Sequence, residues 1–178
     1  MPRRRGLCRL GFPSLFLPLA TCYLLLSMTA HEKVALLAPD LTTTFPRSPR
    51  ETLGSYVVAA RALDKCRAEL AGTQGEYHFD CPLDQIFFTF AGITGAQFKE
   101  FVATGATDNE VAVWLSQQPQ ARETAEIVVW NNKMRCNRLC DVSVELQMFL
   151  ESYIRTFIRK NRPVYVLFDV YDIEEERI

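Results

Sequence analysis

The densest group of reactive side chains lies in GTQGEYHFDCPLD, residues 72–84. This stretch holds a glutamate, a tyrosine, one of the chain's two histidines, two aspartates and a cysteine. Pro82 suits the first position of a helix, because its missing N–H would have no acceptor there. A helix that begins at Pro82 makes Cys81 the N-cap residue and Asp84 the acidic third residue.

This arrangement predicts a reactive thiol at Cys81. A thiol at the first turn of a helix feels the positive end of the helix dipole, which favours the thiolate form. His78, folded back over the cap, would add a positive charge or act as a base. Cys81, His78 and Asp84 are therefore candidate catalytic residues. In the alternative interpretation Asp80 caps the helix and Cys81 packs inward, as free cysteines commonly do.

The same loop contains a candidate metal site. Glu76, His78 and Asp80 supply hard or borderline ligands within a few residues of one another. The loop lacks the paired histidines at i, i+4 and the paired CxxC spacing that mark a strong metal motif. Solvated side chains on a surface loop are the simpler interpretation, and no cofactor is predicted.

Two further groups carry weaker signals. Cys136 and Cys140 are one helical turn apart, which suits a soft metal or a redox pair, but no histidine or second pair accompanies them. Arg47 and Arg50 lie in PRSPRE, where the N-terminus of a helix would help them hold a phosphate. Glu51 competes for the same donors.

A helix is predicted from Pro49 up to Gly72. Ser48 and Glu51 have the spacing of a capping box, in which each side chain accepts a hydrogen bond from the other residue's backbone. Proline is favoured at the first helical position and glycine after the last. Apolar residues then follow at helical spacing, namely Leu53, Tyr56, Val57, Ala60, Leu63 and Leu70.

The capping-box spacing returns twice. Thr94 with Gln97 and Thr107 with Glu110 each precede an apolar run, so two short helices are predicted after Gly92. The second of these helices opens with acidic residues and carries no lysine or arginine, which is the wrong sign for a helix that reads the major groove of DNA.

Three more helices are predicted in the second half of the chain. One lies between residues 120 and 134, and the longest follows Asp141, with Arg159 and Lys160 at its end. The segment 164–178 is rich in β-formers, but its apolar residues recur at i, i+3, i+4 and i+7 and it has no evident strand to pair with, which favours a helix. The sequence thus predicts an all-α single domain of about six to seven helices over residues 41–178, with aromatic residues filling much of the core.

Composition narrows the classes of partner. With 48% hydrophobic and 23% charged residues, the chain matches an average globular domain rather than a disordered or polytopic membrane protein. Without residues 1–27 it keeps 16 basic and 21 acidic residues, a net charge of −5. A mildly acidic body lacks the cationic field that phosphate backbones require, so nucleic acid is excluded as a partner.

Residues 1–30 form a doubtful N-terminal extension. An arginine cluster precedes the uncharged residues 10–30, as in a secretory signal peptide, but two prolines interrupt the run and Met28 occupies a position where a small residue is preferred. As a membrane anchor the run barely reaches the roughly 20 apolar residues that a bilayer requires. The third interpretation is a translation start at Met28. That start would make the protein cytoplasmic, whereas the other two would make it exported or membrane-anchored.

Several ordered motifs resemble one known family. They are FPRSP (45–49), LDK.RA (63–68), G..GEY (72–77), F.GI (90–93), EI..WN (126–131) and FD..D.EE.R (168–177). They resemble an uncharacterised bacterial family known only as a domain of unknown function, DUF5069, over about residues 41–178. The resemblance implies no catalytic residues, and the chain departs from the family around Cys136 to Cys140.

Function is therefore predicted only in outline. No complete set of nucleophile, base and orienting group is visible, so we expect a small helical binding or interaction protein without catalytic activity. Its partner would be an unidentified protein or small molecule, with a membrane involved only if residues 10–30 are an anchor. The alternative is a thiol-dependent enzyme or redox sensor that uses Cys81.

Overall fold

The computed structural model describes residues 28–158 and 162–178. The alternatives for residues 1–27 and the predicted cations Arg159 and Lys160 fall outside these described residues. The regular structure consists of α2 (Ala30–Leu37), β1 (Thr52–Leu53), β2 (Tyr56–Val57), α3 (Ala59–Ala71), α4 (Pro82–Ala91), α5 (Gly95–Val102), α6 (Asp108–Ser116), α7 (Thr124–Arg135), the 3-10 helix η1 (Leu139–Asp141), α8 (Val144–Phe157) and α9 (Leu167–Glu174). The prediction of a mostly helical single domain is confirmed. Of the helices described, none is both long enough and apolar enough to span a bilayer.

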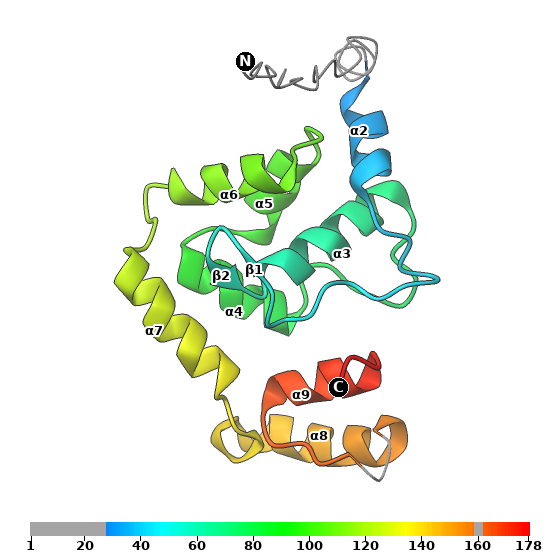
Figure 1. Ribbon diagram of the computed structural model, residues 1–178, viewed down its shortest axis with the longest axis vertical. Helices are drawn as coiled ribbons and strands as arrows, with labels where there is room; N and C mark the ends of the chain where they lie inside the picture. Colours follow the sequence, from blue (N-terminus) through cyan, green and yellow to red (C-terminus); the bar gives the residue numbers. More distant parts are fainter. Residues whose placement is uncertain (1–27, 159–161) are drawn as a thin grey trace, which may run out of the picture.

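Helix α3 lies at the centre of the larger part of the molecule (Figure 1). Every residue from Ala59 to Ala68 is buried, because α2, α4, α5 and the two strands all pack against this helix. The helix ends as predicted at Gly72, which adopts a left-handed φ of 73° and donates its N–H to the carbonyl groups of the last turn. Because α3 is enclosed on all sides, the charged side chains it carries are buried with it.

The predicted start of this helix at Pro49 is wrong. Residues 52–57 form an antiparallel hairpin instead, with Leu53 opposite Tyr56. The turn residues Gly54 and Ser55 have φ values of 54° and 71°, the combination of a tight hairpin turn. Apolar residues at positions 53, 56 and 57 fit a helix and a hairpin equally well, so the pattern alone did not separate the two.

A side chain from α7 holds the hairpin in place. Asn131 Oδ1 accepts the N–H of Val57 at 3.1 Å, and Asn131 Nδ2 donates to the carbonyl of Ser55 at 2.7 Å. The Ser48 N–H does donate to Glu51 Oε1 at 3.3 Å, but this contact closes a turn and starts no helix. Tertiary hydrogen bonds therefore override the local signal.

Three other predicted helix starts are confirmed. Thr94 and Thr107 form capping boxes that start α5 and α6. Cys81 is the N-cap of α4 and Pro82 its first residue. A further capping box at Thr29 starts α2, which the sequence analysis did not predict.

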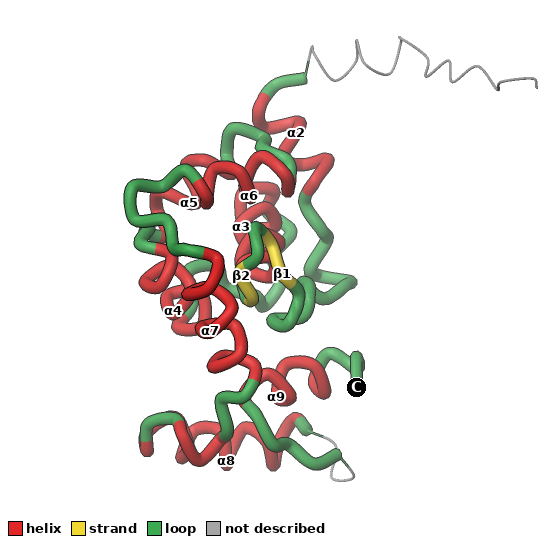
Figure 2. Tube along the Cα trace, turned by 60° about the vertical axis from the view of Figure 1, so that its left-hand side comes forward, coloured by secondary structure: helices red, strands yellow, loops and turns green. Residues whose placement is uncertain are grey.

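The apolar side chains form two clusters. The larger one surrounds α3 and contains the fully buried Phe87, Phe88, Phe98 and Phe168. The smaller one lies between α8 and α9, which run side by side at one end of the molecule (Figure 2). The predicted C-terminal helix is confirmed as α9. Helix α8 is buried only in part, because Phe149 and Phe157 are 59% and 57% exposed.

Candidate functional site

A cavity of about 780 Å³ opens where α3, the loop 72–81 and the C-terminal helices meet. Helix α3 contributes Arg61 and Lys65 to its wall, and α9 contributes Tyr171. The loop contributes His78 and Cys81, two of the predicted catalytic residues. The structure thus brings part of the predicted site to the wall of one cavity.

Cys81 has a cation beside it. The Lys65 ammonium donates to Cys81 Sγ at 3.1 Å and forms an ion pair with Asp84 Oδ2 at 2.8 Å. The Lys65 and Asp84 side chains are 3% and 0% exposed, whereas Cys81 is half-buried at the cavity wall. The sulfur makes no capping hydrogen bond to the α4 backbone. Lys65 therefore joins a thiol at the cavity wall to a fully buried carboxylate.

The sequence predicts His78 as the cation near Cys81. His78 is exposed and lines the same cavity, but the cation in contact with the sulfur is Lys65. Lys65 could have been noticed from its spacing, because it follows Arg61 by four residues in an otherwise Ala- and Leu-rich helix. Such a pair ordinarily marks a solvated face, and only the enclosure of α3 makes it a buried one.

The predicted metal ligands do not converge. Glu76 and His78 line the cavity, but the carboxylate of Asp80 accepts a hydrogen bond from Gln85 and lies against Gly95. A Cβ added at Gly95 would lie 2.3 Å from Asp80 Oδ1, so these two residues are packed tightly together. Within residues 28–158 and 162–178, no group of three or more His, Cys, Asp or Glu side chains is arranged to hold a metal ion.

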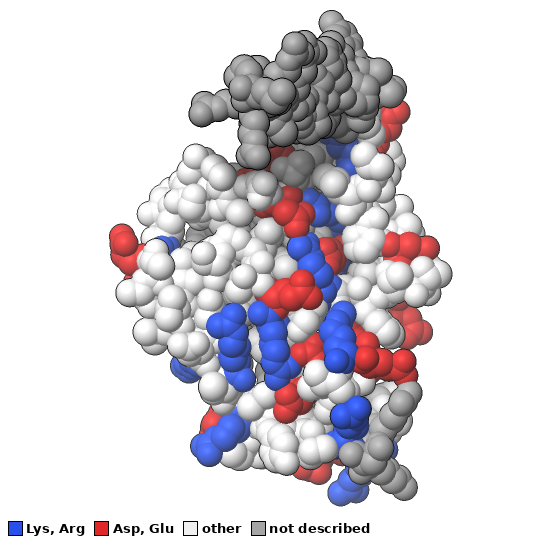
Figure 3. Space-filling model, in the orientation of Figure 1, with Lys and Arg blue, Asp and Glu red and all other residues white. Residues whose placement is uncertain are grey.

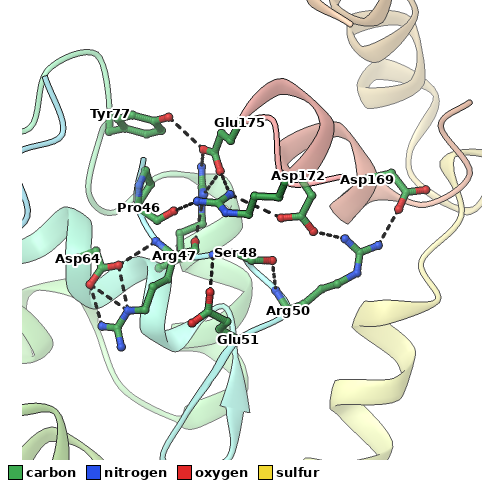
Figure 4. A network of polar contacts seen from close by, with 12 residues as sticks. Pro46, Arg47, Ser48, Arg50, Glu51, Asp64, Tyr77, Asp169, Asp172 and Glu175 are labelled. Atoms are coloured by element: carbon green, nitrogen blue, oxygen red, sulfur yellow. Dashed lines mark hydrogen bonds and ion pairs between the residues drawn. The ribbon is translucent and has the colours of Figure 1, made fainter. Parts of the chain in front are cut away.

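The arginines weighed for phosphate binding are engaged by carboxylates. Arg47 pairs with Asp64 and Asp108, each at 2.7 Å. Arg50 pairs with Asp169 at 2.6 Å and with Asp172 (Figure 4). These contacts join the segment before the hairpin to α3, α6 and α9. The phosphate hypothesis for PRSPRE is thereby replaced by a structural role.

A buried ion pair forms the centre of this network. Arg61 donates through both terminal nitrogens to Glu175, at 2.9 and 2.6 Å, and the two side chains are 4% and 2% exposed. Tyr77 Oη donates to the same carboxylate at 3.0 Å, and Arg177 also pairs with it (Figure 4). Basic and acidic side chains consequently lie side by side in a band on the face shown in Figure 3. Four of the motifs noted in the sequence, at 45–49, 63–68, 72–77 and 168–177, meet in this network.

The four described thiols differ in how deeply they are buried. Burial raises the pKa of the Cys66 thiol to about 12, so this sulfur stays protonated near neutral pH. Burial also raises the pKa of the Asp84 carboxyl, although the Lys65 ammonium opposes that change. Cys136 and Cys140 are exposed and free, with no disulfide between them. Of the four cysteines described, Cys81 is the one at the cavity.

Comparison with known proteins supplies a family. No match was found among curated proteins. One family model, described as Domain of unknown function (DUF5069), matches residues 43–177. That match covers nearly all of the helical domain and agrees with the resemblance seen in the motifs. This chain therefore belongs to the DUF5069 family.

Proposed function

We propose that this protein binds a small molecule in the cavity between α3 and α9. The observation that carries the proposal is the cavity itself, whose volume of about 780 Å³ falls in the range of about 300–1,000 Å³ common for small-molecule sites. Its wall combines apolar surface from Leu41 and Leu83 with the aromatic rings of Tyr77 and Tyr171. Polar groups converge at its inner end, where Lys65 contacts Cys81.

The wall also carries charged or titratable side chains, namely Arg61, Lys65, Glu76, His78, Glu174 and Glu175. This composition favours a ligand with an apolar or aromatic body and a polar group. The apolar body would lie against the tyrosines and leucines. The polar group would reach the inner end of the cavity, where a few fixed donors give orientation and specificity. The binding part of the expected function is thus supported by the geometry.

Protein-observed NMR with a library of small aromatic and aliphatic carbonyl compounds tests the proposal. We expect fragments to shift the signals of Tyr77, Cys81 and Tyr171 together. Thr42→Trp fills the rim of the cavity from an exposed position and is expected to abolish these shifts. Thr44→Trp is the matched control, because Thr44 is exposed, also hydrogen-bonds to Asp40 and lies outside the cavity lining. The proposal fails if no fragment perturbs the lining residues or if both tryptophan variants behave alike.

A second candidate, thiol chemistry at Cys81, is favoured by one contact. The Lys65 ammonium lies 3.1 Å from the sulfur, and a cation at this distance stabilises a thiolate. Iodoacetamide labelling of the folded protein, followed cysteine by cysteine with mass spectrometry, tests it. Cys81 should be labelled faster at neutral pH than the more exposed Cys136 and Cys140, and Cys66 only after unfolding. Equal or slower labelling of Cys81 removes this candidate.

A further inference from the structure

We infer that Cys81 and Lys65, positioned by Asp84, perform acyl transfer on a small carboxylic acid derivative, such as an amide, ester or thioester, bound in the cavity. The inference rests on the proposed binding function and adds a reaction to it. It begins from two distances, 3.1 Å from Lys65 Nζ to Cys81 Sγ and 2.8 Å from Lys65 Nζ to Asp84 Oδ2. A nucleophile in contact with a proton carrier that a third group orients is the arrangement that covalent catalysis requires.

The position of Lys65 supports a role in the reaction as well as a role in joining α3 to α4. An ammonium that is 3% exposed is costly to bury, and Asp84 offsets that cost from the core side. An ion pair that served only to join α3 to α4 would need no sulfur on its other side. Lys65 instead directs a second N–H to Cys81, and both side chains reach the cavity wall. The ammonium has three donors, so serving both neighbours requires no rearrangement.

The first turn of α4 supplies donors for the developing oxyanion. The first N–H groups of a helix have no acceptor within the helix, and an N-cap side chain lies next to those of the second and third residues. In α4 these residues are Leu83 and Asp84, because Pro82 is the first and has no N–H. The Cys81 sulfur does not cap them. A carbonyl oxygen on a group bonded to this sulfur would therefore lie near two backbone donors, as in an oxyanion hole.

The reaction balances without an oxidant or reductant. The Cys81 thiolate attacks the carbonyl carbon, a C–S bond forms, and the π electrons move to the oxygen. As the oxyanion collapses, the bond to the leaving nitrogen, oxygen or sulfur breaks and the Lys65 ammonium gives that atom its proton. The neutral amine then takes a proton from water, whose oxygen attacks the thioester. The C–S bond breaks, the carboxylic acid leaves, and the thiolate and ammonium are restored.

Acyl transfer is favoured over disulfide chemistry by the absence of a partner thiol. Of the described residues that line the cavity, Cys81 alone carries sulfur. Cys66 is buried in the main core, and Cys136 and Cys140 lie around the 3-10 helix η1. A resolving cysteine next to the nucleophile is typical of redox sensors, and this cavity offers none.

p-Nitrophenyl acetate, incubated with the 178-residue chain, tests the inference. The expected result is a burst of one equivalent of nitrophenolate followed by slower turnover, with the acetyl group mapped to Cys81 by peptide mass spectrometry. Cys81→Ser should abolish the burst. The double variant Lys65→Met/Asp84→Asn replaces the buried ion pair with neutral groups, and its acylation rate should fall by about 100-fold, because the Cys81 thiolate loses the cation that stabilises it.

The variant Lys65→Arg tests proton transfer by Lys65 separately from the effect of its positive charge. Arginine keeps the positive charge and the ion pair with Asp84 but does not release its proton. Acetyl-Cys81 should therefore form in this variant and accumulate, because water is not deprotonated to hydrolyse it. Turnover equal to that of the wild-type protein would overturn the proposed role of Lys65. This readout remains available if the double variant does not fold, as judged by circular dichroism.

The positioning role of Asp84 has its own readout. Asp84→Asn should change the pH profile of the acylation rate, since the Lys65 ammonium loses its carboxylate. Tyr171 of α9 interacts electrostatically with the thiol and is unchanged in this variant. The same holds for the other titratable or charged groups that line the cavity, namely Arg61, Glu76, Tyr77, His78, Tyr153, Glu174 and Glu175. An unaltered profile in a folded Asp84→Asn protein would show that Asp84 does not act through Lys65.

Two results distinguish failure of the inference from failure of the proposed binding function. In the first, fragments bind in the cavity but Cys81 is not acetylated faster than Cys136 and Cys140. This result overturns the inference and leaves the binding function intact. The absence of both fragment binding and acetylation at Cys81 overturns both. Nitrophenolate release that persists in Cys81→Ser likewise assigns the reaction to another group and overturns the inference.

Discussion

Arg61 and Glu175 form a two-pronged ion pair, with N–O distances of 2.9 and 2.6 Å, that joins the central helix α3 to the residue after α9. The two positions are 114 residues apart in the chain. Their contact lies beside the cavity, which both residues line. The smaller cluster around α8 and α9 is thus attached to the main core by charge as well as by apolar packing at Phe168 and Tyr171.

Removing the charge of only one partner of this ion pair should strongly lower the free energy of unfolding. Glu175→Gln leaves the Arg61 guanidinium buried without its counter-ion, and such losses cost about 3–5 kcal/mol of unfolding free energy. Urea denaturation followed by circular dichroism measures the change. Lys99→Ala is the control, because Lys99 pairs with Glu69 of the same helix α3 at 2.5 Å but the two side chains are 41% and 33% exposed. Its cost should stay below about 1 kcal/mol. Similar losses in both variants would contradict the distinction between buried and exposed pairs.

Asn131 should hold the hairpin that replaces the predicted start of α3. Asn131→Ala removes the partners of the buried Val57 N–H and of the Ser55 carbonyl, which should cost about 2 kcal/mol because unsatisfied buried groups lose their desolvation energy. Asn132→Ala, at the exposed neighbouring position of α7, should change stability by no more than about 0.5 kcal/mol. Equal thermal midpoints for the two variants would show that the hairpin does not depend on Asn131.

These contacts show which parts of the fold could be predicted from sequence. The capping boxes at Thr94 and Thr107 start helices as predicted, because their hydrogen bonds are local to the first helical turn. The box at Ser48 does not, because Asn131 and the positive φ values of Gly54 and Ser55 favour a hairpin. That competition involves a side chain more than seventy residues away, and no local pattern contains it.

The candidate site was predictable to a similar degree. The N-cap position of Cys81 followed from Pro82, a local feature. The contact with Lys65 depends on how α3 packs against α4. The sequence alone therefore favours His78, the nearest basic residue along the chain. The cavity and the Arg61–Glu175 pair require the C-terminal helix to return to α3, which only the structure shows.

Gly75 should be irreplaceable for steric reasons at the cavity rim. A Cβ at this position would lie 2.7 Å from the Leu41 carbonyl oxygen, and the residue has a φ of 56°. Gly72 has a similar φ of 73°, but an added Cβ there meets no atom within 4 Å. Gly72→Ala should therefore cost only the backbone strain of about 1 kcal/mol, and Gly75→Ala clearly more, because backbone must shift. Chemical denaturation of the two variants gives the difference directly. Equal costs would indicate that the loop moves freely away from Leu41.

Tyr171 should make the protein sensitive to alkali. Burial raises the pKa of its hydroxyl to about 12 from an ordinary value of about 10, with Cys81 and Asp84 nearby and Arg61 opposing the rise. Because the folded state holds the proton more tightly than the unfolded state, the tyrosine's contribution to stability is complete below pH 10 and is lost as the pH rises through about 12. The loss should reach up to about 3 kcal/mol.

Tyr171→Phe isolates this contribution. The variant keeps the aromatic ring, so its stability at pH 7 should stay within about 1 kcal/mol of the wild-type value. Between pH 10 and 12 its unfolding free energy should fall less steeply, since the titrating hydroxyl is gone while Tyr77 and Tyr153 remain in both proteins. Urea denaturation at a series of pH values compares the two slopes. Parallel slopes would mean that Tyr171 ionises equally readily in the folded and unfolded states, and that the wall of the cavity beside Cys81 is open to water.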